Sequence, residues 1–84
     1  MTRFWADGLP ITVTQDDGAA PTSFAWRGQR HAVELVVERW RMDGGWWGRR
    51  AWREYFQCLT ATGLLVLLYH DVRAGTWRLQ RVYD

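Results

Sequence analysis

The chain has 84 residues, of which 48% are hydrophobic and 24% charged, and its formal net charge at neutral pH is +2. A chain of this length makes one small domain, and the composition is that of a folded protein rather than a disordered one. The net charge is too small to indicate nucleic-acid binding by itself. The single Cys58 excludes an internal disulfide and a cysteine-based zinc site. The N-terminus is not a signal peptide and the longest apolar run is too short to cross a bilayer, so we expect a cytoplasmic protein without a membrane partner.

Short runs of alternating apolar and polar residues, separated by turn-forming residues, predict β-strands along the chain. The first run covers residues 9–15 and ends at Asp16-Asp17-Gly18, a sequence typical of a turn. A second short strand is predicted for residues 22–26. It is followed by the tight connection Arg27-Gly28-Gln29.

Residues 30–41 are predicted to form the longest strand. A helix is the competing interpretation, but the β-branched residues and the absence of an N-cap favour the strand. We expect it to stop at Asp43-Gly44-Gly45, with residues 46–50 forming a loop or a short irregular segment. Its alternation predicts an apolar face made by Val33, Leu35 and Val37. The opposite face, with Glu34 and Glu38, is predicted to be solvated.

Three further strands are predicted, at residues 51–60, 64–70 and 76–83. Alternation in the first of these predicts Trp52, Phe56 and Cys58 on one face and Arg53, Tyr55 and Gln57 on the other. The second of these is apolar on both faces, which is typical of a central strand covered on both sides, so that replacing Leu67 by Asp should bury a charge and unfold the protein. Six strands in meander order without a confident helix predict an all-β fold. We expect a small antiparallel meander of five to six strands, rolled into a curved sheet or barrel, as a single domain over residues 1–84.

Tryptophan and arginine are the most informative residues of this sequence. Seven residues are Trp, and all eleven basic residues are Arg. Between Arg39 and Arg53, five Arg accompany a single acid, Asp43. Adjacent Trp rings can stack on bases while guanidinium groups neutralise phosphates. We therefore predict a binding surface for single-stranded nucleic acid, DNA being favoured, made by Arg39, Arg41, Trp46, Trp47, Arg49, Arg50 and Arg53.

The same residues also fit a protein interface, because Trp, Tyr and Arg are the usual hot-spot residues. A protein–protein adaptor or a homodimer is therefore the alternative function, and the Trp46-Trp47 pair fits equally well a role in covering an open end of the fold.

Catalytic motifs are absent from the sequence, which contains no glycine-rich phosphate loop, no histidine pair with metal-ligand spacing and no nucleophile elbow. His70-Asp71 lies at a predicted strand end, where such a pair usually serves a turn. His31 is expected to be a surface or hydrogen-bonded residue. We therefore expect a protein that is not an enzyme and that needs no metal or other cofactor.

An ordered series of short signatures covers about sixty residues of the chain. The series is Phe24-Ala25-Trp26-Arg27-Gly28, His31-Ala32-Val33, Glu38-Arg39-Trp40-Arg41, Trp46-Trp47, Arg53-Glu54-Tyr55-Phe56-Gln57, Gly63-Leu64-Leu65, Trp77-Arg78-Leu79 and Val82-Tyr83. It resembles the small uncharacterised domain at the C-terminus of ImuB-type proteins, which are catalytically inactive relatives of Y-family DNA polymerases. The resemblance implies a role in DNA damage tolerance by translesion synthesis, with a DNA polymerase or other mutagenesis proteins as partners. No polymerase-like region precedes the domain here, so we expect a free-standing copy.

Overall fold

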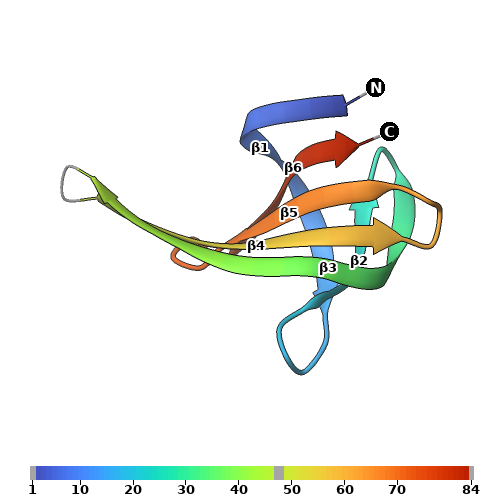
Figure 1. Cartoon of the computed structure of the whole chain (residues 1–84), viewed down its shortest axis with the longest axis horizontal. Helices are drawn as coiled ribbons and strands as arrows, with labels where there is room; N and C mark the ends of the chain where they lie inside the picture. Colours follow the sequence, from blue (N-terminus) through green and yellow to red (C-terminus); the bar gives the residue numbers. More distant parts are fainter. Residues whose placement is uncertain (1, 47–48, 84) are drawn as a thin grey trace.

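The computed structural model describes residues 2–46 and 49–83, and these residues form six β-strands (Figure 1). The strands are β1 (Thr2–Gln15), β2 (Pro21–Trp26), β3 (Gln29–Trp46), β4 (Arg49–Thr60), β5 (Leu65–Asp71) and β6 (Thr76–Tyr83). Each strand is antiparallel to the next, and the order β1-β2-β3-β4-β5-β6 closes into a barrel. The predicted all-β antiparallel fold is confirmed.

Strand β1 closes the sheet because its two halves pair with different neighbours. Its first half, from Thr2 to Ile11, pairs with β6, and its second half, from Thr12 to Gln15, pairs with β2. The sequence predicted only the second part of this strand, from residue 9. The earlier residues lack a regular alternation, and a register shift between Phe4 and Leu9 accounts for that.

The turn between β2 and β3 is one that the sequence specifies locally. Arg27 and Gly28 both have positive φ, at 54° and 71°, and the flanking Trp26 and Gln29 pair directly. Two such residues in succession twist the chain in the sense that an antiparallel hairpin needs. Glycine at the second position lowers the cost of this conformation.

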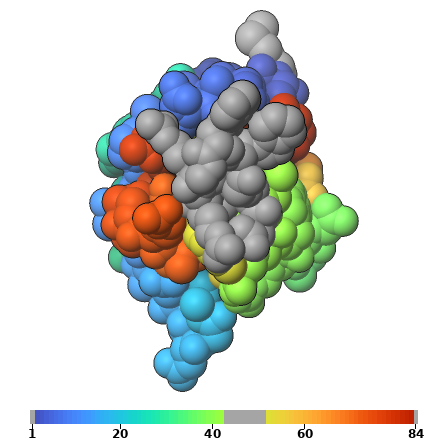
Figure 2. Space-filling view, turned by 90° about the vertical axis from the view of Figure 1, so that its left-hand side faces the viewer, coloured from blue at the N-terminus to red at the C-terminus, as the bar shows by residue number. Residues whose placement is uncertain are grey.

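Strands β3 and β4 leave the closed sheet together as a two-stranded arm (Figure 1). Beyond Arg53, which pairs with Asp71 of β5, the ladder between β3 and β4 continues from Asp43↔Trp52 to Trp46↔Arg49. The prediction that Asp43-Gly44-Gly45 ends the strand is therefore wrong, as is the assignment of residue 46 and residues 49–50 to a loop. Pairing with β4 keeps the glycines extended. Figure 2 views the molecule from the side of the arm, with the β1–β2 loop projecting from the body at the bottom.

The inner face of the closed sheet holds the core, which consists of Phe24, Trp26, Phe56, Cys58, Val66, Leu68, Trp77, Leu79 and Val82. The predicted faces of β4 are correct, because Phe56 and Cys58 point inward. The predicted apolar face of β3 is only partly correct. Register shifts on either side of Leu35 and Val36 interrupt the alternation, so Val33 and Val36 pack on the core. Leu35 and Val37 remain 56% and 49% exposed.

Strand β5 is less completely covered than the sequence predicted. Leu68 is fully buried in the core, whereas Leu67 is half-buried on the outer face, opposite Gln57 and Arg81. The expectation that an Asp at position 67 would enter the core is therefore wrong.

Candidate nucleic-acid interface

The predicted binding residues lie along the β3–β4 ribbon and its arm. The side chains of Arg39, Arg41 and Arg53 are described, whereas for Trp46, Arg49 and Arg50 only the backbone positions at the far end of the ladder are described. Trp47 lies outside the described residues. Side chains alternate between the two faces of a strand. Arg39 and Arg41 therefore share one face of the ribbon, and Arg53 lies on the other.

Glu54 occupies the same face as Arg39 and Arg41 and partly neutralises them. Its carboxylate accepts hydrogen bonds from Nε of Arg39 at 2.7 Å and from the Arg39 Nη2. The Arg41 Nη2 lies 3.6 Å from the other carboxylate oxygen. The Arg39 guanidinium also stacks over the Phe56 ring, 5.0 Å from its centroid. Two positive charges thus share one largely buried acid, and these three side chains together carry a net charge of about +1.

The opposite face, on the outside of the sheet, contains Arg53 among tyrosines. Its guanidinium donates a hydrogen bond to the Tyr55 hydroxyl at 3.3 Å and lies 4.6 Å from the centroid of the Tyr69 ring. The hydrogen bond to Tyr55 raises the pKa of Arg53. Arg78, next to Tyr69 in the sheet, donates to the Gly8 carbonyl at 3.1 Å. These hydrogen bonds go to neutral oxygens, so neither arginine loses its charge to a carboxylate through them.

An aromatic row crosses this outer face beside Arg53. Trp40, Tyr55 and Tyr69 are cross-strand neighbours on β3, β4 and β5. The Trp40 and Tyr55 rings are stacked, with centroids 5.3 Å apart and planes at 5°, and Tyr55 and Tyr69 are tilted at 5.4 Å. Both tyrosines are buried, whereas Trp40 is 37% exposed. Trp40 is thus the ring of this row that remains accessible to a partner.

The sequence prediction did not include Trp40, Tyr55, Tyr69 or Arg78. Alternation alone places Tyr55 on the same face as Arg53, and that signal was available. The alignment of Trp40 and Tyr69 with it depends on the pairing register between strands, which the sequence does not state.

The two histidines both serve the fold. His70 stacks on Trp77 at 4.7 Å, and the Asp71 carboxylate accepts a hydrogen bond from the Ala74 amide in the β5–β6 turn. His31 is buried against Phe24 and its Nδ1 lies 3.1 Å from the Thr62 hydroxyl. Among the described residues, no group of His, Cys, Asp and Glu could hold a metal ion. In the same part of the chain, no helix has the length and apolar character that a membrane crossing requires.

Together these features define a small, closed antiparallel β domain with an arginine-rich, aromatic ribbon. Comparison with protein families gives a match over residues 1–84 to the domain of unknown function DUF6504, and the chain belongs to this family. The comparisons with curated proteins and with solved structures gave no match.

Proposed function

We propose that this protein is a non-enzymatic accessory domain that binds single-stranded nucleic acid on the outer face of the β3–β4 ribbon. The observation that carries the proposal is the exposed Trp40 ring, held by its stack on Tyr55 next to Arg53, whose guanidinium hydrogen-bonds to the neutral Tyr55 hydroxyl. Trp47, Trp46, Arg49 and Arg50 continue the same ribbon in sequence and belong to the proposed site. Arg39 and Arg41 would act from the opposite face.

The chemistry of this face suits a single strand. A base that stacks on an aromatic ring contributes about 1–3 kcal/mol, and arginines alongside follow the phosphates. Stacking on Tyr55 fixes the Trp40 ring before any ligand arrives, which reduces the entropy lost on binding. A duplex would not offer base faces to such a ring, so single strands are the expected ligand.

The proposed biological setting is DNA damage tolerance. It rests on the ordered Trp and Arg signatures that resemble the small C-terminal domain of ImuB-type proteins. If the two domains correspond, this chain would bring single-stranded DNA and a mutagenesis polymerase or its accessory proteins together.

Binding can be measured by the fluorescence anisotropy of a labelled oligothymidylate at low and moderate salt. We expect Trp40→Leu to weaken binding about 5- to 150-fold, the equivalent of one lost stack. Arg53→Gln should lower both the affinity and, by about 0.7, the slope of log affinity against log salt, as expected when one phosphate contact on a single strand is lost. Trp40→Phe keeps an aromatic ring and should restore most of the affinity.

The matched control is Arg41→Gln, which removes the same charge from the opposite face of the same ribbon. It should have a smaller effect than Arg53→Gln. Equal losses in the two variants would show that net charge, rather than the Trp40 face, governs binding. No binding by the wild-type protein at low salt would refute the proposal altogether. Two further variants test the arm in the same assay. One is the double variant Arg49→Ala, Arg50→Ala, and the other is the single variant Trp47→Ala.

A protein partner or a second copy of the chain is the second candidate, and a different observation favours it. Leu35, Val37 and Met42 are 56%, 49% and 54% exposed along β3, and Trp40 lies between Val37 and Met42 in the sequence. Exposed apolar residues gathered on one strand are typical of an interface. We propose that this apolar edge of the outer face, rather than the charged ribbon, would contact such a partner.

Light scattering at micromolar concentration tests self-association directly. An apolar interface would be supported if the wild-type protein has a dimer mass that persists at high salt and Leu35→Glu has a monomer mass. Salt is informative because phosphate binding weakens steeply with salt whereas apolar contacts do not. A monomer mass for the wild-type protein would exclude the homodimer.

A further inference from the structure

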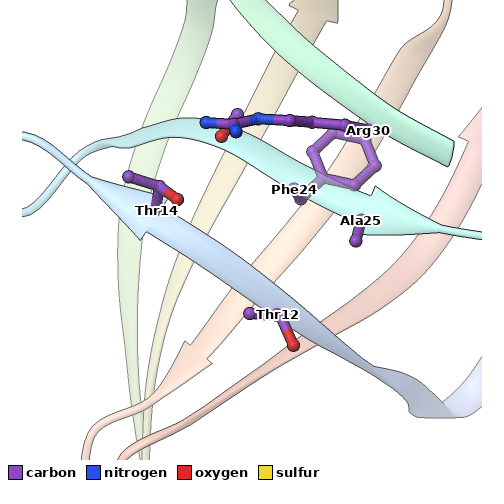
Figure 3. A pocket seen from close by; sticks show the side chains of 6 residues that line it. Thr12, Thr14, Phe24, Ala25 and Arg30 are labelled. Atoms are coloured by element: carbon purple, nitrogen blue, oxygen red, sulfur yellow. The ribbon is translucent and has the colours of Figure 1, made fainter.

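A hollow of about 170 Å³ lies on the molecule away from the β3–β4 arm, between β1 and β2 (Figure 3). It is lined by Thr12, Thr14, Ser23, Phe24, Ala25 and Arg30. The strand registers explain why it exists. Thr12, Ala25 and Arg30 are cross-strand neighbours in one row, and Thr14 and Ser23 are neighbours in the next. The small side chains of Ser23 and Ala25 in the middle strand leave the space open between larger neighbours.

The polar groups around this hollow are available to a ligand. Arg30 is exposed, and the described part of the chain gives its guanidinium no hydrogen bond, ion pair or ring contact. The hydroxyls of Thr12, Thr14 and Ser23 likewise have no partner among the described residues. Ser23 is only 5% exposed, but its Oγ is not among the fully buried side-chain atoms without a partner, so the hydroxyl can reach a ligand or water in the hollow. Figure 3 shows the Arg30 side chain extended along β2, with its nitrogens on the side of Thr14.

The sign and geometry of these groups select the ligand. A guanidinium donates two parallel hydrogen bonds to a planar pair of oxygens, and hydroxyls add single donors around them. No carboxylate lines the hollow, so nothing in it repels an anion. Its volume admits a small oxyanion together with water.

We propose that this hollow is a binding site for a phosphate group, with Arg30 as the charged ligand and Thr12, Thr14 and Ser23 as hydroxyl donors. The site is independent of the outer face of the ribbon and of its proposed function. A phosphate group reaches such a site either as a free ion or as the terminal 5′-phosphate of an oligonucleotide, and both present the same oxygens.

The site can be tested by following amide and arginine Nε–H resonances while inorganic phosphate is added, with chloride at matched ionic strength as the reference. We expect saturable shifts confined to the lining residues. Arg30→Gln should weaken binding about tenfold or more, which is the effect of losing a charge-assisted hydrogen bond. Arg27→Gln is the matched control, because Arg27 lies in the adjacent turn with its guanidinium over Trp26. It should bind phosphate as the wild-type protein does.

A second titration distinguishes the two sources of phosphate. A 5′-phosphorylated oligothymidylate that binds more tightly than its unphosphorylated counterpart, with the difference abolished in Arg30→Gln, would identify a strand terminus as the ligand. Equal affinities of the two oligonucleotides would exclude the terminal 5′-phosphate and leave the free phosphate ion as the ligand. Shifts that do not saturate with phosphate, or that survive unchanged in Arg30→Gln, would overturn the site. Ser23→Ala adds a fold-preserving check, since it removes one donor without changing the charge.

Discussion

Gly8 lies in the half of β1 that closes the sheet, and a Cβ added at this residue would overlap its neighbours. Its φ is +75°, and a Cβ there would lie 2.7 Å from both the Tyr69 hydroxyl and Cβ of Arg78. The Tyr69 hydroxyl in turn donates a hydrogen bond of 2.8 Å to the Asp7 carbonyl. Since Tyr69 is almost fully buried, it has little room to move away. The glycine therefore lets the first half of β1 lie directly on this tyrosine.

We predict that Gly8→Ala destabilises the protein more than an equivalent change elsewhere. Gly63→Ala is the control, because Gly63 also has positive φ, at 89°, but open space where its Cβ would be. The control should cost about 1–2 kcal/mol for the backbone conformation alone. Gly8→Ala should cost about 1–3 kcal/mol more, because of the added overlap. Urea denaturation gives both values, and equal costs would show that the contact with Tyr69 relaxes freely.

Cys58 links the core to the behaviour of the protein in alkali. Burial raises the pKa of its thiol from 9.0 to about 12. The folded state therefore holds the proton over a range of pH in which the unfolded chain releases it. The stabilisation is complete below pH 9 and is lost as the pH rises from there towards 12.

We accordingly expect the free energy of unfolding to fall by about 1 kcal/mol between pH 8 and 10 on account of this thiol. Cys58→Ala should be less stable at neutral pH, since it leaves a small cavity, but its stability should vary less over that range. Denaturant titrations of the two proteins at several pH values provide the comparison. Parallel pH profiles would show that another group is responsible. Burial also raises the pKa of Tyr69, but this tyrosine affects stability mainly above pH 10.

At the scale of the strand, β5 offers adjacent leucines in opposite environments. Leu68 is fully buried, whereas Leu67 faces outward beside Arg81. We predict that Leu68→Asp abolishes cooperative folding, because it places an unpaired charge in the core. Leu67→Asp should fold with a loss of about 1–2 kcal/mol, with the new carboxylate close to a cation. Thermal melts followed by circular dichroism distinguish the two, and unfolding of both would show that the outer face is buried in solution.

The pairing between strands also explains which features of the fold alternation alone did not predict. Period-two alternation located all six strands and the inward face of β4, because those residues obey the simple pattern. It failed on β3, where two local irregularities turn Leu35 and Val37 outward. It also failed at Gly44 and Gly45, since local propensity favours a turn there and only the pairing with β4 overrides it.

The candidate interface was predictable in composition and not in arrangement. The excess of Arg between residues 39 and 53 is visible in the sequence. Glu54, which neutralises part of it, sits just beyond that window, and the stack of Trp40 on Tyr55 depends on a cross-strand register. Faces and partners are properties of pairing between strands, so they emerged only from the structure.

At the scale of the whole molecule, the body and the arm differ in how their backbones are held. In the body, Tyr55 to Cys58 of β4 has a hydrogen-bonded strand on each side, whereas Arg49 to Ala51 pairs only with β3 among the described residues. We predict that amides of the arm exchange with solvent hydrogen much faster than those of the body, because the arm ladder has no third strand beside it among the described residues. Exchange followed by NMR tests this, and comparable protection in both would indicate that the arm is packed against another molecule.

The pairing of Thr2 with Tyr83 brings the two ends of the domain together as neighbours in one ladder (Figure 1). Residues paired in this way have Cα atoms about 4.5–5.5 Å apart. A few added residues could therefore join the two ends without disturbing the closed sheet, and new ends could be opened in the exposed turn at Thr62 and Gly63. For the same reason, the domain has the geometry of an insert. It could be carried in a surface loop of a larger protein, where it would enter and leave its host at almost the same point.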